Sequence, residues 1–122
     1  MEREDYQKLH QRAKQLLRDY WDNLVDPSPA EKVDLILNQD GEEIPIDVQV
    51  RTSWKGDEFT YDHITLPEKM KQLRGWLVQF NVPLTRFLVL RNSDIRNLPV
   101  RGEYIFIPKS KATFYDVGIR VL

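Results

Sequence analysis

Apolar side chains recur every three or four residues along the first part of the chain, which is the spacing of one helical face. Between residue 2 and about residue 25 they stand at Leu9, Ala13, Leu16, Leu17, Tyr20, Trp21 and Leu24. This period predicts an amphipathic helix. Pro27 and Pro29 break the pattern, because proline lacks an N–H donor and restricts the residue before it. A loop is therefore expected after the helix.

A two-residue period follows the loop and predicts strands. Val33, Leu35 and Leu37 alternate with Asp34, Ile36 and Asn38, and the turn pair Asp40-Gly41 leads into a second apolar arm at Ile44. These two arms predict a β-hairpin. In the second arm Ile46, Val48 and Val50 point to one face, while Asp47, Gln49 and Arg51 point to the other.

The rest of the chain mixes strand and helix signals. A third strand from Glu58 to Ile64, after the turn Lys55-Gly56-Asp57, would complete a meander. Thr65 and Glu68 have the spacing of a capping box and predict a second helix, with an apolar face at Met70, Leu73, Leu77 and Val78 or Phe80. Phe87–Leu90 is a continuous apolar run, typical of a buried central strand. Two more strands are expected at residues 104–107, closed by Pro108, and at residues 114–121.

This order of helix, β-meander, helix and strand predicts an α+β fold with a mixed central sheet in α/β/α-type layers. The length of 122 residues suits a single domain over residues 1–122, and 41% apolar with 30% charged residues is ordinary for a globular chain. The absence of cysteine excludes a disulfide scaffold and a thiolate zinc site. No apolar run approaches the roughly 20 residues that span a bilayer, so we expect no membrane partner and a cytoplasmic location.

Charge is distributed unevenly along the chain. Residues 1–52 hold seven Lys and Arg against twelve Asp and Glu, whereas residues 53–122 hold eleven against seven. An acidic first half could surround a cation and a basic second half could meet phosphates, although a mixed solvated surface explains the same counts. The sequence pI near 6.1 argues against a protein that coats nucleic acid, so any such contact must be local.

The informative motif lies on the two arms of the predicted hairpin. Asp34 stands on the first arm, and Gln49 and Arg51 stand two residues apart within Val48-Gln49-Val50-Arg51-Thr52-Ser53 on the second. This arrangement resembles the PD-(D/E)XK nuclease superfamily, and the six-residue segment is similar to the VQVKTS segment of branches in which glutamine replaces the acidic residue. The resemblance follows the element order of residues 1 to about 91. It implies a restriction-endonuclease-like fold and metal-dependent cleavage of DNA.

The chemistry of these residue types supports the same expectation. Phosphodiester hydrolysis needs a divalent cation that polarises the phosphoryl oxygen, and Mg²⁺ or Mn²⁺ prefers oxygen ligands. Asp34 and Gln49 on neighbouring strands could converge on one ion, with the Val50 carbonyl as a third oxygen and Asp47 compensating for the missing acid. Arg51 would stand beside the ion and clamp a phosphate, since a guanidinium stays protonated and cannot act as a base.

Two departures from the family pattern affect this expectation. The family has lysine where this chain has Arg51, and an acid where it has Gln49, which lowers the expected metal affinity. Relatives often carry a glutamate on the first helix; the roughly equivalent position here is near His10, with Glu2, Glu4 and Asp5 further upstream, and the sequence does not assign it. His10 and His63 are lone histidines without metal-ligand spacing, so surface or hydrogen-bonded roles are the simpler interpretation.

Each candidate also has a structural interpretation. Asp34 could be a hairpin residue, and Asp47, Gln49 and Arg51 could form the exposed face of a half-buried strand. The leading hypothesis is a Mg²⁺-dependent DNA endonuclease in which Asp34, Gln49 and Arg51 carry the reaction. DNA-backbone contacts are expected from Lys55, Arg86, Arg91 and Arg96. The alternatives are a nuclease-fold module that binds nucleic acid or protein without activity, and a homo-oligomer joined through the strands of residues 104–122.

Overall fold

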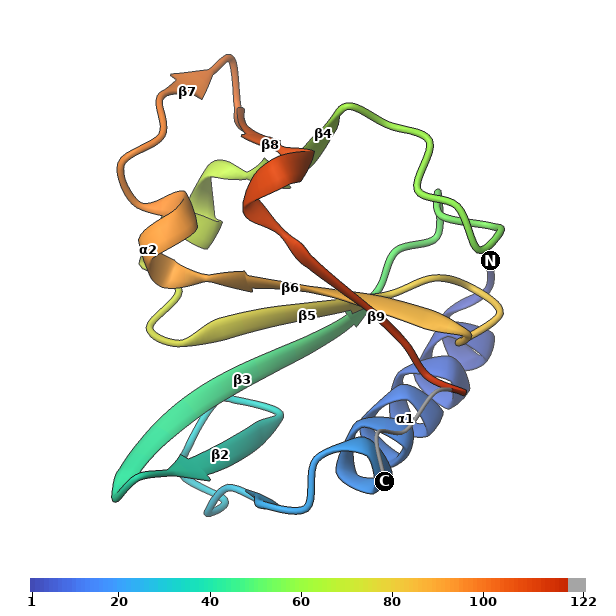
Figure 1. The fold of residues 1–122 in the computed structure, drawn as a ribbon, viewed down its shortest axis with the longest axis vertical. Coiled ribbons are helices and arrows are strands. Elements are labelled where there is room, and N and C mark those ends of the chain that lie inside the picture. The colour runs from blue at the N-terminus through green and yellow to red at the C-terminus, as the bar shows by residue number, and fades with distance from the viewer. Residues whose placement is uncertain (119–122) are drawn as a thin grey trace.

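The computed structural model describes residues 1–118 and has an α+β fold built around a mixed sheet (Figure 1). The helices are α1 (Arg3–Tyr20) and α2 (Asn92–Ile95), with 3-10 turns η1 (Glu68–Gln72) and η2 (Lys109–Lys111). The strands are β1 (Leu24–Val25), β2 (Leu35–Gln39), β3 (Glu42–Val50), β4 (His63–Pro67), β5 (Trp76–Phe80), β6 (Arg86–Arg91), β7 (Val100–Arg101), β8 (Tyr104–Pro108) and β9 (Thr113–Asp116). Within the described residues, no helix is both long and apolar enough to cross a bilayer.

The nine strands found in residues 1–118 form two sheets. The larger sheet has the order β1-β2-β3-β5-β6-β9, and the smaller one has the order β4-β8-β7. In the larger sheet β3 and β5 run parallel, and the other neighbours are antiparallel. Figure 1 shows β3, β5 and β6 side by side in the middle of the molecule, with the small sheet beyond them.

Two hydrophobic clusters hold these layers together, one on each face of the larger sheet. On one face, Ala13 and Leu17 of α1 pack against inward side chains that include Ile46, Val48 and Val50 of β3. On the other face, side chains of β5 and β6 pack against β4, β8 and α2. The predicted α/β/α-type layering is therefore wrong in its second helical layer, which is mainly the three-stranded sheet.

The hairpin and the later strands confirm part of the sequence interpretation. Asp40 and Gly41 both have positive φ, at 51° and 82°, which is the backbone that a two-residue turn between antiparallel strands requires. The apolar run Phe87–Leu90 lies fully buried in β6, and Tyr104–Pro108 forms β8. The last predicted strand, residues 114–121, corresponds to β9, which stops at Asp116. Residues 119–121 of that prediction lie outside the described residues.

The first helix is shorter than predicted. It ends at Tyr20, where the next residue, Trp21, adopts an extended backbone with φ −115° and ψ 119°. Leu24 then belongs to β1, which pairs with β2. The helical period continued through Leu24 because Trp21 and Leu24 pack against the same cluster as the helix.

The prediction of a strand over residues 58–64 and a helix after Thr65 is wrong. Thr65 lies within β4, which belongs to the second sheet, and only the short η1 follows it. Residues 76–80 form β5, whose buried side chains fill both clusters. Gly75 allows β5 to begin close to β3, because a Cβ there would lie 1.9 Å from the Pro45 carbonyl oxygen. A continuous apolar run of this kind fits a buried strand as well as a helix.

Candidate functional site

β3 changes its hydrogen-bonded neighbour halfway along its length. Residues 42–46 pair with β2, and residues 46–50 pair with β5. The Arg51 N–H bonds to the Phe80 carbonyl on the β5 side. Because successive strand residues direct their backbone groups to opposite edges, those of Val48 and Val50 point to the edge that β2 has left. We call this the freed edge of β3.

Asp34 occupies the freed edge just before β2 begins. Its N–H bonds to the Ile46 carbonyl at 3.1 Å, and its side-chain Oδ2 accepts the Val48 N–H at 2.8 Å. A buried backbone N–H without a partner costs about 1–3 kcal/mol, so this bond fixes the carboxylate and also satisfies β3. Asp34 is therefore a hairpin residue with a second role as a partner of the next strand.

Two side chains from α1 complete the freed edge. His10 Nε2 lies 2.9 Å from the Val48 carbonyl oxygen and 3.4 Å from Asp34 Oδ1. Since a carbonyl oxygen only accepts, Nε2 carries a proton and donates it here. Tyr6, one turn earlier on the helix, accepts the Val50 N–H through its hydroxyl at 3.3 Å, and its ring stacks on His10 with centroids 6.2 Å apart. The helix thus contributes a donor and an acceptor to the same edge.

Asp47 adds a second carboxyl group close to Asp34. Burial raises the pKa of the Asp47 carboxyl, and the negative charge of Asp34 raises it further. Both effects disfavour the ionised form. A bound cation would oppose both, because it would neutralise the charge that makes the pair unfavourable.

Gln49 and Arg51 are joined through a residue on the neighbouring strand. Gln79, which is 3% exposed, donates to Gln49 Oε1 at 2.9 Å and accepts from Arg51 Nη1 at 3.2 Å. Arg51 Nη1 also donates to the Thr65 carbonyl at 3.3 Å. Burial lowers the pKa of the Arg51 guanidinium, an effect that Tyr61 partly offsets, yet an arginine remains charged at neutral pH.

The oxygen atoms near the freed edge fit a hard divalent cation by their chemistry. In residues 1–118 no group of three or more His, Asp or Glu side chains is arranged to hold a metal ion. A cation here must therefore combine the Asp34 and Asp47 carboxylates with neutral oxygens, for which the Val50 carbonyl and the Gln49 amide are the candidates. Such oxygen sets suit Mg²⁺ and Mn²⁺.

The four basic residues expected to contact DNA do not form one patch. Arg86 pairs with Asp116, with Nε and Oδ1 2.7 Å apart. Arg91 lies at the other end of β6, about 17 Å from Arg86 along the strand, since each strand residue adds about 3.3 Å. Lys55 is exposed in the loop after β3, and Arg96 is exposed at the end of α2.

Sequence reasoning missed Tyr6 and Gln79, and it interpreted His10 as a surface or hydrogen-bonded residue without identifying its partner. Tyr6 and His10 are four apart on α1 and so share a helical face, which was a readable signal. Gln79 is a polar residue inside the apolar run 76–80, and it would have stood out if that run had been interpreted as a strand. His63 lies in β4, in the second sheet.

A comparison of the chain with protein-family models, curated proteins and solved structures finds no match.

Proposed function

We propose that this protein is a divalent-metal-dependent DNA endonuclease with a restriction-endonuclease-like fold. The fold-level support is the hairpin β2-β3, the parallel neighbour β5 and the helix α1 packed on the face that holds Val48 and Val50. The site-level support is the Asp34 carboxylate at the freed edge together with the Asp47 carboxyl, whose pKa responds to the Asp34 charge. The assignment rests on the resemblance of the motif together with this geometry.

One observation carries the proposal. The Asp34 carboxylate is held at the freed edge by the Val48 N–H, and the pKa of the Asp47 carboxyl is raised first by burial and then by the charge of Asp34. Two carboxyl groups near enough to interact, one of them partly buried, are unfavourable in their ionised forms without a cation. An arrangement that is costly for folding but suited to a dication is typical of a functional site.

The residues would divide the work as follows. Asp34, Asp47, the Val50 carbonyl and the Gln49 amide would hold the cation, which when bound supplies Lewis-acid polarisation of a phosphoryl oxygen. Arg51 supplies a permanent positive charge on the same strand face, where it can stabilise charge that develops on the phosphate. His10 donates to the Val48 carbonyl, and its Nε2 lies 3.4 Å from Asp34 Oδ1, so the ring packs beside the carboxylate.

Cleavage of DNA by the purified chain tests the proposal. Plasmid and branched DNA are incubated with Mg²⁺ or Mn²⁺, and cleavage products are followed on gels. Asp34→Asn keeps an acceptor for the Val48 N–H but removes the charge, so it should fold normally and lose more than about 100-fold in rate, since even outer-shell metal partners cost 10–100-fold.

Glu43→Gln is the matched control, because it removes one exposed carboxylate from the β2-paired half of β3. Its rate should stay within about twofold of the parent protein, since Glu43 is outside the site. Mn²⁺ should also raise the melting temperature of the parent protein and leave that of Asp34→Asn unchanged. Absence of both cleavage and metal stabilisation in the parent protein would contradict the proposal.

A second candidate is a nuclease-fold module that binds DNA without cutting it. The observation that favours it is the network through Gln79, because Gln49 Oε1 and Arg51 Nη1 are already engaged in hydrogen bonds. This module would bind DNA without metal, with an affinity that falls steeply with salt. Binding that survives Asp34→Asn, together with absence of cleavage, would select it.

A further inference from the structure

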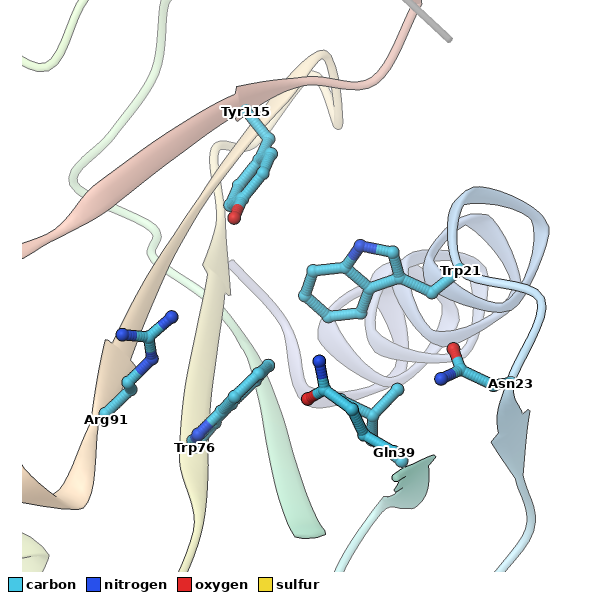
Figure 2. A pocket seen from close by; sticks show the side chains of 7 residues that line it. Trp21, Asn23, Gln39, Trp76, Arg91 and Tyr115 are labelled. Atoms are coloured by element: carbon cyan, nitrogen blue, oxygen red, sulfur yellow. The ribbon is translucent and has the colours of Figure 1, made fainter. Parts of the chain in front are cut away.

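A pocket of about 240 Å³ opens beside the first residue of β5, away from the carboxyl groups of the freed edge. Figure 2 shows three aromatic side chains, Trp21, Trp76 and Tyr115, arranged around it together with Arg91 and the amides of Gln39 and Asn23. These residues come from the segment after α1 and from the strands β2, β5, β6 and β9, so the fold brings together five separate parts of the chain.

The aromatic rings frame the opening without closing it. Trp21 meets Trp76 with ring centroids 6.2 Å apart at 69°, and meets Tyr115 with centroids 6.0 Å apart at 85°. In such steep edge-to-face contacts one ring covers only part of the face of the other, unlike in a parallel stack. All three side chains are only partly buried, so aromatic surface remains accessible to a flat ligand.

Arg91 restricts the class of ligand. Its guanidinium lies 5.2 Å from the centre of the Trp76 ring, and no carboxylate of the described residues forms a salt bridge with it. Three aromatic rings alone could hold a quaternary ammonium group. A permanent positive charge at the wall disfavours a cation and favours a ligand that carries negative charge beside an aromatic ring.

The two amides supply hydrogen bonds at the rim. Asn23 Nδ2 donates to the Asn38 carbonyl at 2.6 Å. This bond fixes the orientation of the Asn23 amide, whose Oδ1 can accept a hydrogen bond from a ligand. Gln39 is exposed, and its amide points toward the pocket in Figure 2. Side-chain amides offer a donor and an acceptor together, which is the pattern that matches the edge of a nucleobase.

We propose that this aromatic pocket binds an unpaired nucleobase of a DNA strand, with Arg91 contacting the adjacent phosphate. This inference names DNA with unpaired bases as the substrate class of the proposed endonuclease. Its link to cleavage rests on the proposed function. Leu37, which lines the pocket, stands three residues from Asp34, or about 10 Å along the strand.

The test measures binding of fluorescent 12-nucleotide strands by anisotropy in EDTA, so neither metal nor cleavage is needed. One DNA strand carries all its bases, and a second strand of equal charge carries abasic positions at its centre. The parent protein should bind the complete strand about tenfold or more tightly, because stacking on an aromatic side chain is worth that factor per base. A ribonucleotide strand and a blunt duplex are included, and the duplex should bind more weakly than the complete single strand.

Variants locate the effect. Arg91→Gln, at an exposed position, should weaken binding of the complete strand, whereas Arg101→Gln, which removes the same charge from the small sheet, should change it less than twofold. Trp76→Leu should abolish the preference over the abasic strand, and circular dichroism checks that it folds. If Trp76→Leu is unfolded, Gln39→Ala replaces it and should reduce the same preference.

The outcomes separate this inference from the proposed function. Binding that depends on Arg91, with a base preference that depends on Trp76 or Gln39, supports the pocket even if the protein never cleaves DNA. Equal affinity for complete and abasic strands, no binding of either, or a preference for RNA or duplex would overturn it, even if Asp34-dependent cleavage is found.

Discussion

The two halves of β3 are paired on opposite edges, and they satisfy their free edges in different ways. Residues 42–46 pair with β2, and on their other side the Pro45 carbonyl lies against the backbone of Gly75. Residues 46–50 pair with β5, and on their other side Asp34, His10 and Tyr6 supply hydrogen bonds from side chains. One free edge is closed by close backbone packing and the other by titratable and polar groups.

This difference explains why the candidate chemistry is at only one end of the strand. An edge closed by backbone contact leaves no room for a ligand, whereas an edge satisfied by side chains can exchange one of them for a ligand. The first half should therefore respond to added volume, and the second half should respond to changes of charge and hydrogen bonding.

The largest effect is expected from Gly75→Ala at the closed edge. The new Cβ would lie 1.9 Å from the Pro45 carbonyl oxygen, so β3 and β5 must move apart. Overpacking of this kind costs about 3 kcal/mol or more when the obstacle is backbone. The measurement is urea denaturation, with Gly56→Ala as the control, because a Cβ at Gly56 meets only open space. Equal stability of the two variants would show that the edge is not closed by contact.

A smaller loss is expected from Asp34→Ala at the freed edge. The Val48 N–H loses its acceptor, which costs about 1–3 kcal/mol. Asp34→Asn keeps an acceptor oxygen and should retain most of that stability. The difference between the two variants in urea denaturation measures the hydrogen bond, and no difference would mean that the carboxylate does not support the strand.

The fold was predictable from sequence where the signal is local. The pair Asp40-Gly41 fixes the turn, and the alternation on either side fixes which residues share a face, so the hairpin was predicted correctly. Residues 76–80 were predicted as helix because Leu73 and Leu77 have helical spacing. Their strand conformation depends on the parallel contact with β3, about 30 residues earlier in the chain, which no local pattern records.

The candidate site was predictable only in part. Strand alternation predicted that Asp47 and Gln49 share a face of β3 and that Arg51 continues it, and Gln49 and Arg51 do meet at Gln79. The contacts that define the chemistry join α1 to β3 and β5 to β3, such as His10 with Val48 and Gln79 with Gln49. These contacts are set by how the layers pack, so the sequence indicated the residue types without indicating which of them meet.

A still smaller loss of stability is expected from His10→Ala at the freed edge. It removes the donor to the Val48 carbonyl, a part-buried bond worth about 1 kcal/mol. Gln11→Ala is the control on the same helix, because Gln11 is exposed. If thermal unfolding gives the same stability for both variants, the α1 contacts do not contribute to the freed edge.

The smallest effect is expected from Asp47→Asn, and its sign is opposite to the others. Folding raises the pKa of the Asp47 carboxyl above its ordinary value of 3.8, chiefly through burial and also through Asp34. The native state therefore binds the proton more tightly than the unfolded state, and stability falls as the pH rises from about 3.8 through the native pKa. Asparagine carries no charge, so the variant should be slightly more stable than the parent protein at pH 7, and the difference should shrink as the pH is lowered toward 4. Urea denaturation across this range measures the difference in stability.

Saturating Mn²⁺ should reverse the order of stability of Asp47→Asn and the parent protein at pH 7, because only the parent protein gains a cation that offsets the unfavourable charge. A variant that is less stable than the parent at every pH without metal would show that Asp47 is a structural hydrogen-bonding group and that the freed edge holds no excess of negative charge.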